Sequence, residues 1–269
     1  MVRKLFKYEI KSYLRILLPI NLIILAVAVF GRIIQFFESD STVYDIVFGS
    51  SMFGLFAGAA VLLVMTVIVV IVRFYKNLFT SEGYLSFTLP VTESQHIAVK
   101  LITALLFEFF AVVTLILSAA IMTSGETLVE IIKAIAYLLK SLMGEIGAHL
   151  PIYIIEIALL ILASAVYNIL LYYTCICIGQ RAKKNRIFIA VLVYFAYYAI
   201  VQIISTVAVI VAALSASTGI YETLLSWIID YPFTFMHALF GISIAVMAGM
   251  CIVWFFITRS TMQNRLNLE

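Results

Sequence analysis

Long runs of apolar residues divide the chain, and shorter polar segments separate them. A helix that crosses the hydrocarbon core of a bilayer needs about 20 mainly apolar residues. Six runs meet this length, at residues 16–36, 46–72, 101–123, 151–179, 187–214 and 233–258. Proline is tolerated in the first turn of a helix, and Pro19, Pro151 and Pro232 lie near the starts of three runs. The pattern predicts an all-α polytopic membrane protein, a single transmembrane domain (1–269) with six transmembrane helices.

Composition supports the same class. The 269 residues are 65% hydrophobic and 12% charged, whereas a soluble domain carries about a quarter charged residues and about half apolar ones. Water-exposed folding would leave too little polar surface to cover the apolar residues. The net charge is only +3, so bulk charge gives no reason to expect a nucleic-acid partner, and the lipid bilayer is the expected surrounding.

The placement of the basic residues predicts the orientation. Of the 17 lysines and arginines, 14 fall on one side of the predicted spans: Arg3, Lys4, Lys7, Lys11, Arg15, Arg73, Lys76, Lys100, Arg181, Lys183, Lys184, Arg186, Arg259 and Arg265. Cytoplasmic loops of membrane proteins carry an excess of Lys and Arg. We therefore expect both termini, including the tail 259–269, on the cytoplasmic side of a bacterial cytoplasmic membrane.

Two amphipathic segments are expected beside the membrane. Residues 1–15 place basic side chains on one face and apolar ones on another, which favours an interfacial helix on the cytoplasmic leaflet; a plain basic flank that only sets topology is the alternative. Within the outer segment 124–150, residues 126–146 carry a polar stripe at helical spacing. That stripe favours an outer interfacial helix over a seventh crossing. A short surface or re-entrant helix is expected within 216–232.

The segment 73–100 is a long connection between two spans, about 28 residues, whereas such connections are usually short. It predicts a short helix near 74–80, a turn, an extended stretch over 84–89 and a break at Pro90. Thr92 and Gln95 have the spacing of a capping box that opens the third span. Its apolar side chains favour docking onto a membrane or a cytoplasmic partner.

A family resemblance is carried by this loop. The stretch KNLFTSEGYLSFTLPVTESQHIAVK resembles the first cytoplasmic loop of bacterial type-2 ABC transporter permeases, in which "Y-K-N-L…E-G-Y-L…T-L-P-V" leads into the third span. The tail Asn264-Arg-Leu-Asn-Leu-Glu and the sequence Ile178-Gly179-Gln180 before basic residues are also similar to that family. The long outer segment 124–150 departs from it.

The resemblance implies a transmembrane permease subunit of an ATP-driven exporter. The loop after the second span would form a coupling helix that contacts a separate ABC ATPase subunit, braced by the N-terminal helix, and a second permease copy or a paralogue would complete a dimer. By position, the ATPase-coupling residues would be Asn77, Thr80, Glu82, Gly83, Tyr84 and Leu85. Peptide or drug efflux is the cargo class suggested by analogy.

Four polar residues within the spans are candidates for function: Glu108, Glu156, Asn168 and Gln202. Ionisable groups inside a membrane are costly and commonly functional. The two glutamates could contact substrate or a cation, or could serve in packing when protonated or hydrogen-bonded. For Asn168 and Gln202 we expect interhelical hydrogen bonds in preference to ligand contacts.

Motifs of catalysis are not found in the sequence. It contains no G-x-x-x-x-G-K-[ST], H-E-x-x-H or G-x-S-x-G, so we expect no enzyme activity and no cofactor in this chain, with ATP and Mg²⁺ bound by the partner ATPase. The three histidines are far apart in the predicted topology, so no metal site is expected. The alternative function is an ATP-independent secondary transporter or membrane binding module that uses the intramembrane carboxylates.

Overall fold

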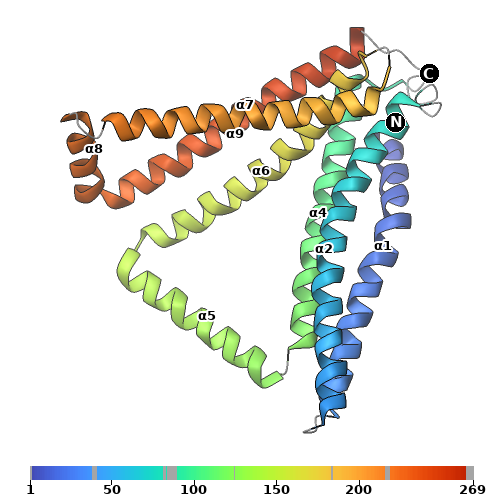
Figure 1. Cartoon of the computed structure of the whole chain (residues 1–269), viewed down its shortest axis with the longest axis vertical. Coiled ribbons are helices and arrows are strands. Elements are labelled where there is room, and N and C mark those ends of the chain that lie inside the picture. The colour runs from blue at the N-terminus through green and yellow to red at the C-terminus, as the bar shows by residue number, and fades with distance from the viewer. Residues whose placement is uncertain are drawn as a thin grey trace. The chain divides into compact units, whose positions relative to one another are not determined.

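The chain folds as helices in a computed structural model that describes residues 2–37, 41–80, 83, 90–123, 125–182, 184–215 and 219–264. Eight helices lie within these residues and no strand does (Figure 1). Their bounds are α1 (Val2–Gln35), α2 (Thr42–Phe79), α4 (Glu93–Met122), α5 (Gly125–Ile146), α6 (His149–Gly179), α7 (Arg186–Leu214), α8 (Gly219–Asp230) and α9 (Pro232–Asn264). The predicted all-α class is confirmed.

Six helices are long and apolar enough to cross a membrane: α1, α2, α4, α6, α7 and α9. They coincide with the six predicted spans, so the protein is a multi-pass membrane protein. Large aliphatic and aromatic side chains are exposed along these helices, and α7 has no buried residue. So much exposed apolar surface is unfavourable in water and is solvated by lipid in a membrane.

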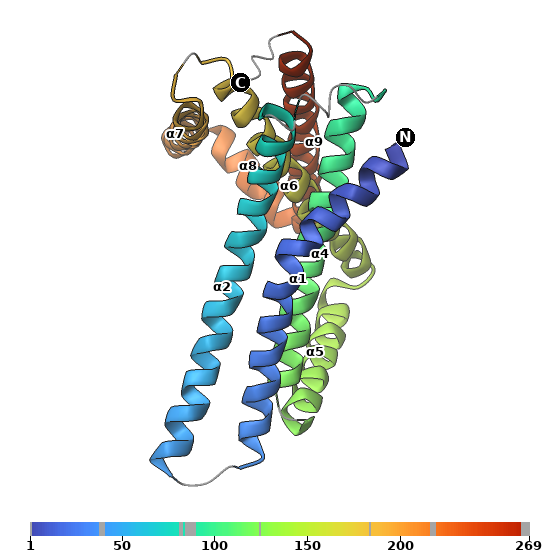
Figure 2. The same cartoon turned by 90° about the vertical axis from the view of Figure 1, so that its right-hand side faces the viewer.

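Helix α1 differs from its prediction. The expected interfacial helix and first span form one continuous helix, so Pro19 lies in the helix interior and not in a first turn. Figure 2 shows the N-terminal part of α1 inclined to the rest of the helix. Proline removes one backbone hydrogen bond and its ring presses on the preceding turn, which accounts for a bend without a break. Pro151 and Pro232 do lie in the first turns of α6 and α9, as predicted.

The connection between the second and third spans is shorter than the sequence suggested. The expected short helix near 74–80 is the continuous end of α2, which runs to Phe79. Helix α4 begins at Glu93, and the predicted capping box is confirmed: the Thr92 hydroxyl accepts from the Gln95 backbone N–H, and the Gln95 side chain accepts from the Thr92 N–H. The expected extended stretch 84–89 lies outside the described residues.

The first of two compact units contains α1, α2 and α4. Helices α1 and α4 run parallel, joined near their starts by Glu9 and Lys100 and near their ends by a 2.6 Å hydrogen bond from Gln35 Nε2 to the Met122 carbonyl. Helix α2 runs antiparallel to both (Figures 1 and 2). The three helices share a small apolar core of Ile24, Leu62 and Ala111.

Two glycines allow α2 to approach α1. A Cβ at Gly58 would lie 3.3 Å from Ile24 Cγ1, and one at Gly54 would lie 3.6 Å from Val27 Cγ1. These two glycines of the second span therefore serve packing inside the chain, because a missing side chain lets two helices come close.

The second unit contains α6, α7 and α9. Helices α6 and α9 run parallel: His149 meets His237 near their starts, and Thr174 meets Thr258 near their ends. Helix α7 runs antiparallel to α6, because Tyr167 contacts Tyr197 while Gly179 lies against Ala190. Apart from α5 in the first unit and α8 in the second, each unit is therefore a parallel pair of helices with a third, antiparallel helix beside it.

Two further helices were expected beside the membrane and both exist as helices. Helix α5 has no buried residue, and it is not among the six described helices that meet the criteria for a span. Its apolar side chains, including Ile132, Ile135 and Leu138, are exposed along its length. Helix α8 packs on α9 through an edge contact between Trp227 and Phe235.

Candidate functional site

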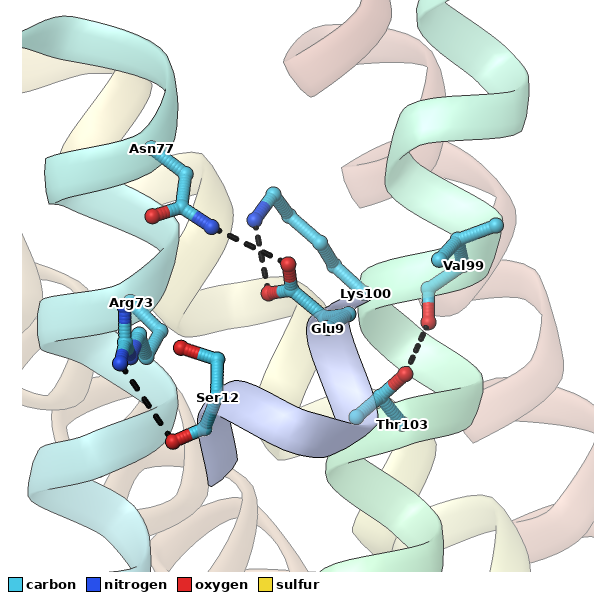
Figure 3. A network of polar contacts seen from close by, with 7 residues as sticks. All are labelled: Glu9, Ser12, Arg73, Asn77, Val99, Lys100 and Thr103. Carbon is cyan, nitrogen blue, oxygen red and sulfur yellow. Dashed lines mark hydrogen bonds and ion pairs between the residues drawn. The ribbon is translucent and has the colours of Figure 1, made fainter. Parts of the chain in front are cut away.

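A buried carboxylate joins all three helices of the first unit. The Glu9 side chain on α1 accepts from Lys100 Nζ on α4 at 2.9 Å through Oε1, and from Asn77 Nδ2 on α2 at 3.0 Å through Oε2 (Figure 3). The side chains of Lys100 and Glu9 are only 4% and 5% exposed. Both carboxylate oxygens are thus bonded, one of them to a cation, which is the condition under which a buried charge is tolerated.

The local sequence explains how Glu9 reaches this position. The basic side chains Arg3, Lys4, Lys7, Lys11 and Arg15 are exposed on α1. Glu9 lies on the opposite face with Tyr13 and Leu17, which are 0% and 1% exposed. Residues four apart share one face of a helix, so the helix that carries the basic stripe also presents its carboxylate to α2 and α4.

Neighbouring contacts hold the same end of the unit. The Tyr13 ring stacks on Phe107 of α4, with 5.1 Å between centroids. Arg73 on α2 donates to the Ser12 carbonyl over a long 3.4 Å. We call Glu9, Lys100 and Asn77 the ionic lock of the first unit. It fixes the last turns of α2 and the first turns of α4, the two helix ends from which the 80–92 connection starts and finishes.

The second unit has its own polar cluster at the starts of α6 and α9. His237 Nδ1 lies 2.9 Å from both Glu156 oxygens, and His237 Nε2 lies 3.0 Å from His149 Nδ1. The rings are stacked among aromatic neighbours, His149 on Phe233 at 4.8 Å and His237 on Tyr153 at 4.4 Å between centroids. We call His149, His237 and Glu156 the histidine lock of the second unit.

The histidine lock corrects one expectation from the sequence. The predicted topology separates His149 from His237, but the two are in contact, because α6 and α9 run parallel and bring their first two turns together. Among the described residues, no group of three or more His, Cys, Asp or Glu side chains has the arrangement of a metal site. In the lock, His237 uses one ring nitrogen for Glu156 and the other for His149.

An aromatic cluster ties α6 to α7 and α9 further along the second unit. The Tyr167 hydroxyl is hydrogen-bonded to the Tyr197 hydroxyl, and Tyr197 meets Trp254 edge-on at 5.2 Å. Beyond it, the Thr174 and Thr258 hydroxyls bond at 3.0 Å in a fully buried position. These contacts are uncharged and serve packing between helices.

The coupling residues implied by the family resemblance are only partly within the described structure. Asn77, Thr80 and Gly83 are described, and Glu82, Tyr84 and Leu85 lie outside the described residues. The Asn77 amide donates to Glu9, so this side chain belongs to the ionic lock. Thr80 directly follows the end of α2, and Gly83 is buried.

The four intramembrane polar residues do not form one site. Glu156 belongs to the histidine lock. Glu108 is part-buried on α4 and makes no hydrogen bond or ion pair with any described residue. The expected interhelical bond of Asn168 is wrong, because its amide donates to the Ser164 carbonyl one turn earlier in the same helix at 2.8 Å. Gln202 is exposed on α7.

Glu9 and Lys100 were not identified as site residues from the sequence, although the sequence around each contains a feature that points to it. Glu9 is the only acidic residue among the first 37, and it lies on the apolar face of a helix that is otherwise basic. Lys100 is the one cation inside the apolar stretch 97–123. A lone acid and a lone base on apolar faces of neighbouring spans are candidates for an ion pair, since neither charge is stable alone in such surroundings.

Comparisons with known proteins give no relative for this chain. No protein-family model, no curated protein and no solved structure matches it. Its function is therefore argued from its own residues and contacts.

Proposed function

We propose that the chain is the membrane-spanning permease subunit of an ATP-driven exporter of the type-2 ABC class. Both termini would lie in the cytoplasm of a bacterial cell, a separate ATPase would bind the 80–92 connection, and a second permease copy or paralogue would complete the translocation path. The family resemblance of residues 73–100 is the origin of this proposal.

The ionic lock is the observation that supports it best. A permease driven by a separate ATPase must carry motion from a cytoplasmic loop into its membrane helices. Here the two helix ends beside the connection, at Asn77 and Lys100, are both bonded to Glu9 of the N-terminal helix. A displacement of the loop would therefore move α1, α2 and α4 together, since a paired buried charge cannot be pulled apart cheaply.

The test is isolation of the intact complex through a tag on this chain. Under the proposal an ATP-hydrolysing partner co-purifies, and Glu82→Ala or Tyr84→Ala removes it while the unfolding midpoint of the permease is unchanged. Substitutions are preferable to deletion of the loop, because a deletion that includes Asn77 also breaks the ionic lock. Glu126→Ala on the exposed helix α5 is the matched control and should leave the partner bound.

A second candidate function is ATP-independent secondary transport, and one observation favours it. Glu156, an acidic residue within a span, is bonded to a histidine, and such pairs take part in proton relays of transporters. Transport driven by a proton gradient in vesicles that contain only this chain would support this candidate. The same result, together with retention of any partner in the Glu82 and Tyr84 variants, would contradict the permease proposal.

A further inference from the structure

The histidine lock has a hydrogen-bond direction that its geometry dictates. A neutral imidazole has one nitrogen that donates and one that accepts. His237 faces a carboxylate with Nδ1 and another imidazole with Nε2. With Glu156 ionised and both rings neutral, His237 must donate from Nδ1 to Glu156 and accept at Nε2 from His149 Nδ1–H. The cluster then carries one negative charge.

One added proton reverses the bond between the two rings. The proton enters at His149 Nε2, and the Nδ1 proton of His149 passes across the 3.0 Å contact to His237 Nε2. His149 remains neutral but changes tautomer, from Nδ1–H to Nε2–H. His237 now carries N–H groups on both ring nitrogens and is a cation paired with Glu156, so the cluster is neutral. Every hydrogen bond of the lock survives in this state.

A second proton on His149 disrupts this arrangement. It would make His149 a cation with N–H groups on both ring nitrogens, facing an N–H of His237. Two donors do not bond, and two like charges at this distance repel. The bond that joins the starts of α6 and α9 through the two histidines would open.

Few titratable groups lie near the two histidines. On α6 they are Glu156, which belongs to the lock, and the Tyr153 hydroxyl, which donates to the Phe233 carbonyl at 3.3 Å. Helix α8, which packs on α9, carries Glu222 and Asp230. The tyrosines of α7 contact α6 at Tyr167 and Tyr172, several turns from His149. Glu156 is therefore the one charged side chain in direct contact with either histidine among the described residues.

We propose that His149, His237 and Glu156 form a proton-binding site in which the first proton makes His237 a cation paired with Glu156, and in which a second proton breaks the hydrogen bond between the two histidines. The site does not depend on the permease proposal. Histidine is the side chain that titrates between about pH 5 and 8, and His237 and Glu156 are 22% and 18% exposed, so protons can reach them.

The test is ¹⁵N nuclear magnetic resonance of histidine side chains in the full-length protein in lipid nanodiscs. The chain has only three histidines, so the spectrum is simple, and His96, on α4 of the other unit, is an internal reference. We expect His149 to change tautomer as the first proton binds, with a coupling across the N–H···N bond before and after that step. The coupling should vanish when the second proton binds.

Variants assign the two steps. Glu156→Gln keeps an acceptor oxygen but removes the negative charge, so the first proton should bind only at a pH lower by about one to three units. His149→Asn should abolish the second step and leave the first. Glu126→Gln on exposed α5 should change neither.

Two results would overturn the proposal. One is a His149 that keeps a single tautomer while both rings titrate independently. The other is a Glu156→Gln variant that titrates like the parent protein. Because the tautomer change is read in the unaltered protein, the test stands even if a variant fails to fold.

Discussion

The two helical units share an arrangement of helices and differ in the side chains that join those helices. In each, two parallel helices are linked near their starts by a polar cluster, and a third helix runs antiparallel beside them. The first unit uses a lysine and a glutamate, 4% and 5% exposed. The second uses two histidines and a glutamate, of which His237 and Glu156 are 22% and 18% exposed.

The difference decides how each unit responds to its surroundings. Lys100 and Glu9 form a buried pair of opposite charges, and separating them would leave a buried charge without a counter-charge. The histidine lock contains a pair of imidazoles in contact, and we propose that its proton count changes. The same helix arrangement is therefore joined by a buried ion pair in one unit and, under our proposal, by a proton-dependent contact in the other.

The largest effect should come from breaking the ionic lock. Lys100→Met leaves the Glu9 carboxylate buried without a counter-charge, which should lower the free energy of unfolding by about 3–5 kcal/mol. The double variant Glu9→Leu/Lys100→Met removes both charges and should recover most of that loss. Denaturant titration in detergent micelles measures both values.

The control for this prediction is Lys11→Met, which removes an exposed lysine of α1, the helix that carries Glu9. It should change stability by no more than about 0.5 kcal/mol. If the double variant is as unstable as Lys100→Met alone, the pair contributes net stability of its own and the simple desolvation argument is wrong.

The next largest loss of stability should come from replacing a glycine, and it should differ between two glycines, one in each unit. A Cβ at Gly179 would lie 2.7 Å from both Ala190 Cβ and the Arg186 carbonyl oxygen, atoms that cannot turn aside. A Cβ at Gly31 would meet the terminal methyl of Met122, a flexible side chain that can move. Gly179→Ala should cost about 1–3 kcal/mol, and Gly31→Ala clearly less.

Thermal unfolding of the two glycine variants in the same detergent gives the comparison directly. Equal losses would mean that Met122 is as tightly held as the α7 backbone.

Much of the fold could be predicted because the bilayer fixes the length of a spanning helix. Six apolar runs gave six helices, and the Thr92–Gln95 pair gave the start of α4 by a purely local rule. The ends of α1 and α2 were placed wrongly because hydrophobicity marks only the part of a helix that lies inside lipid. Both helices continue past that part.

The locks could not be predicted from local patterns. Glu9 and Lys100 are 91 positions apart, and His149 and His237 are 88 apart. A helical pattern tells which residues share a face, but not which face of another helix it meets. For Asn168 the error is the opposite one. A partner on another helix was expected, but the side chain donates to a backbone carbonyl of its own helix.

A smaller effect is expected at the starts of α4 and α6. Helix α4 begins with a complete capping box, whereas Ala148, at the start of α6, has no side-chain cap. Thr92→Ala should therefore cost about 1 kcal/mol. Thr92→Ser retains the hydroxyl and should cost little. Hydrogen exchange of the first turn of α4 localises the loss, and unchanged exchange there would show that the cap does not stabilise the helix.

The smallest effect should distinguish two buried threonines with the same local bond. Thr103 in α4 donates to the carbonyl four residues earlier in its own helix, as Thr174 in α6 also does. Thr174 alone of the two also meets a hydroxyl of another helix, Thr258 at 3.0 Å. Replacement by valine keeps the shape of either side chain and removes its hydroxyl.

Hydrogen bonds between membrane helices contribute about 0.6 kcal/mol on average, so Thr174→Val should lose roughly that much more stability than Thr103→Val. A double-mutant cycle with Thr258→Val isolates the term, because the extra loss should disappear when Thr258 has already been replaced. A coupling energy of zero would mean that the Thr174–Thr258 contact adds no stability, and that α6 and α9 are held by the histidine lock, by the other hydrogen bonds between them and by packing.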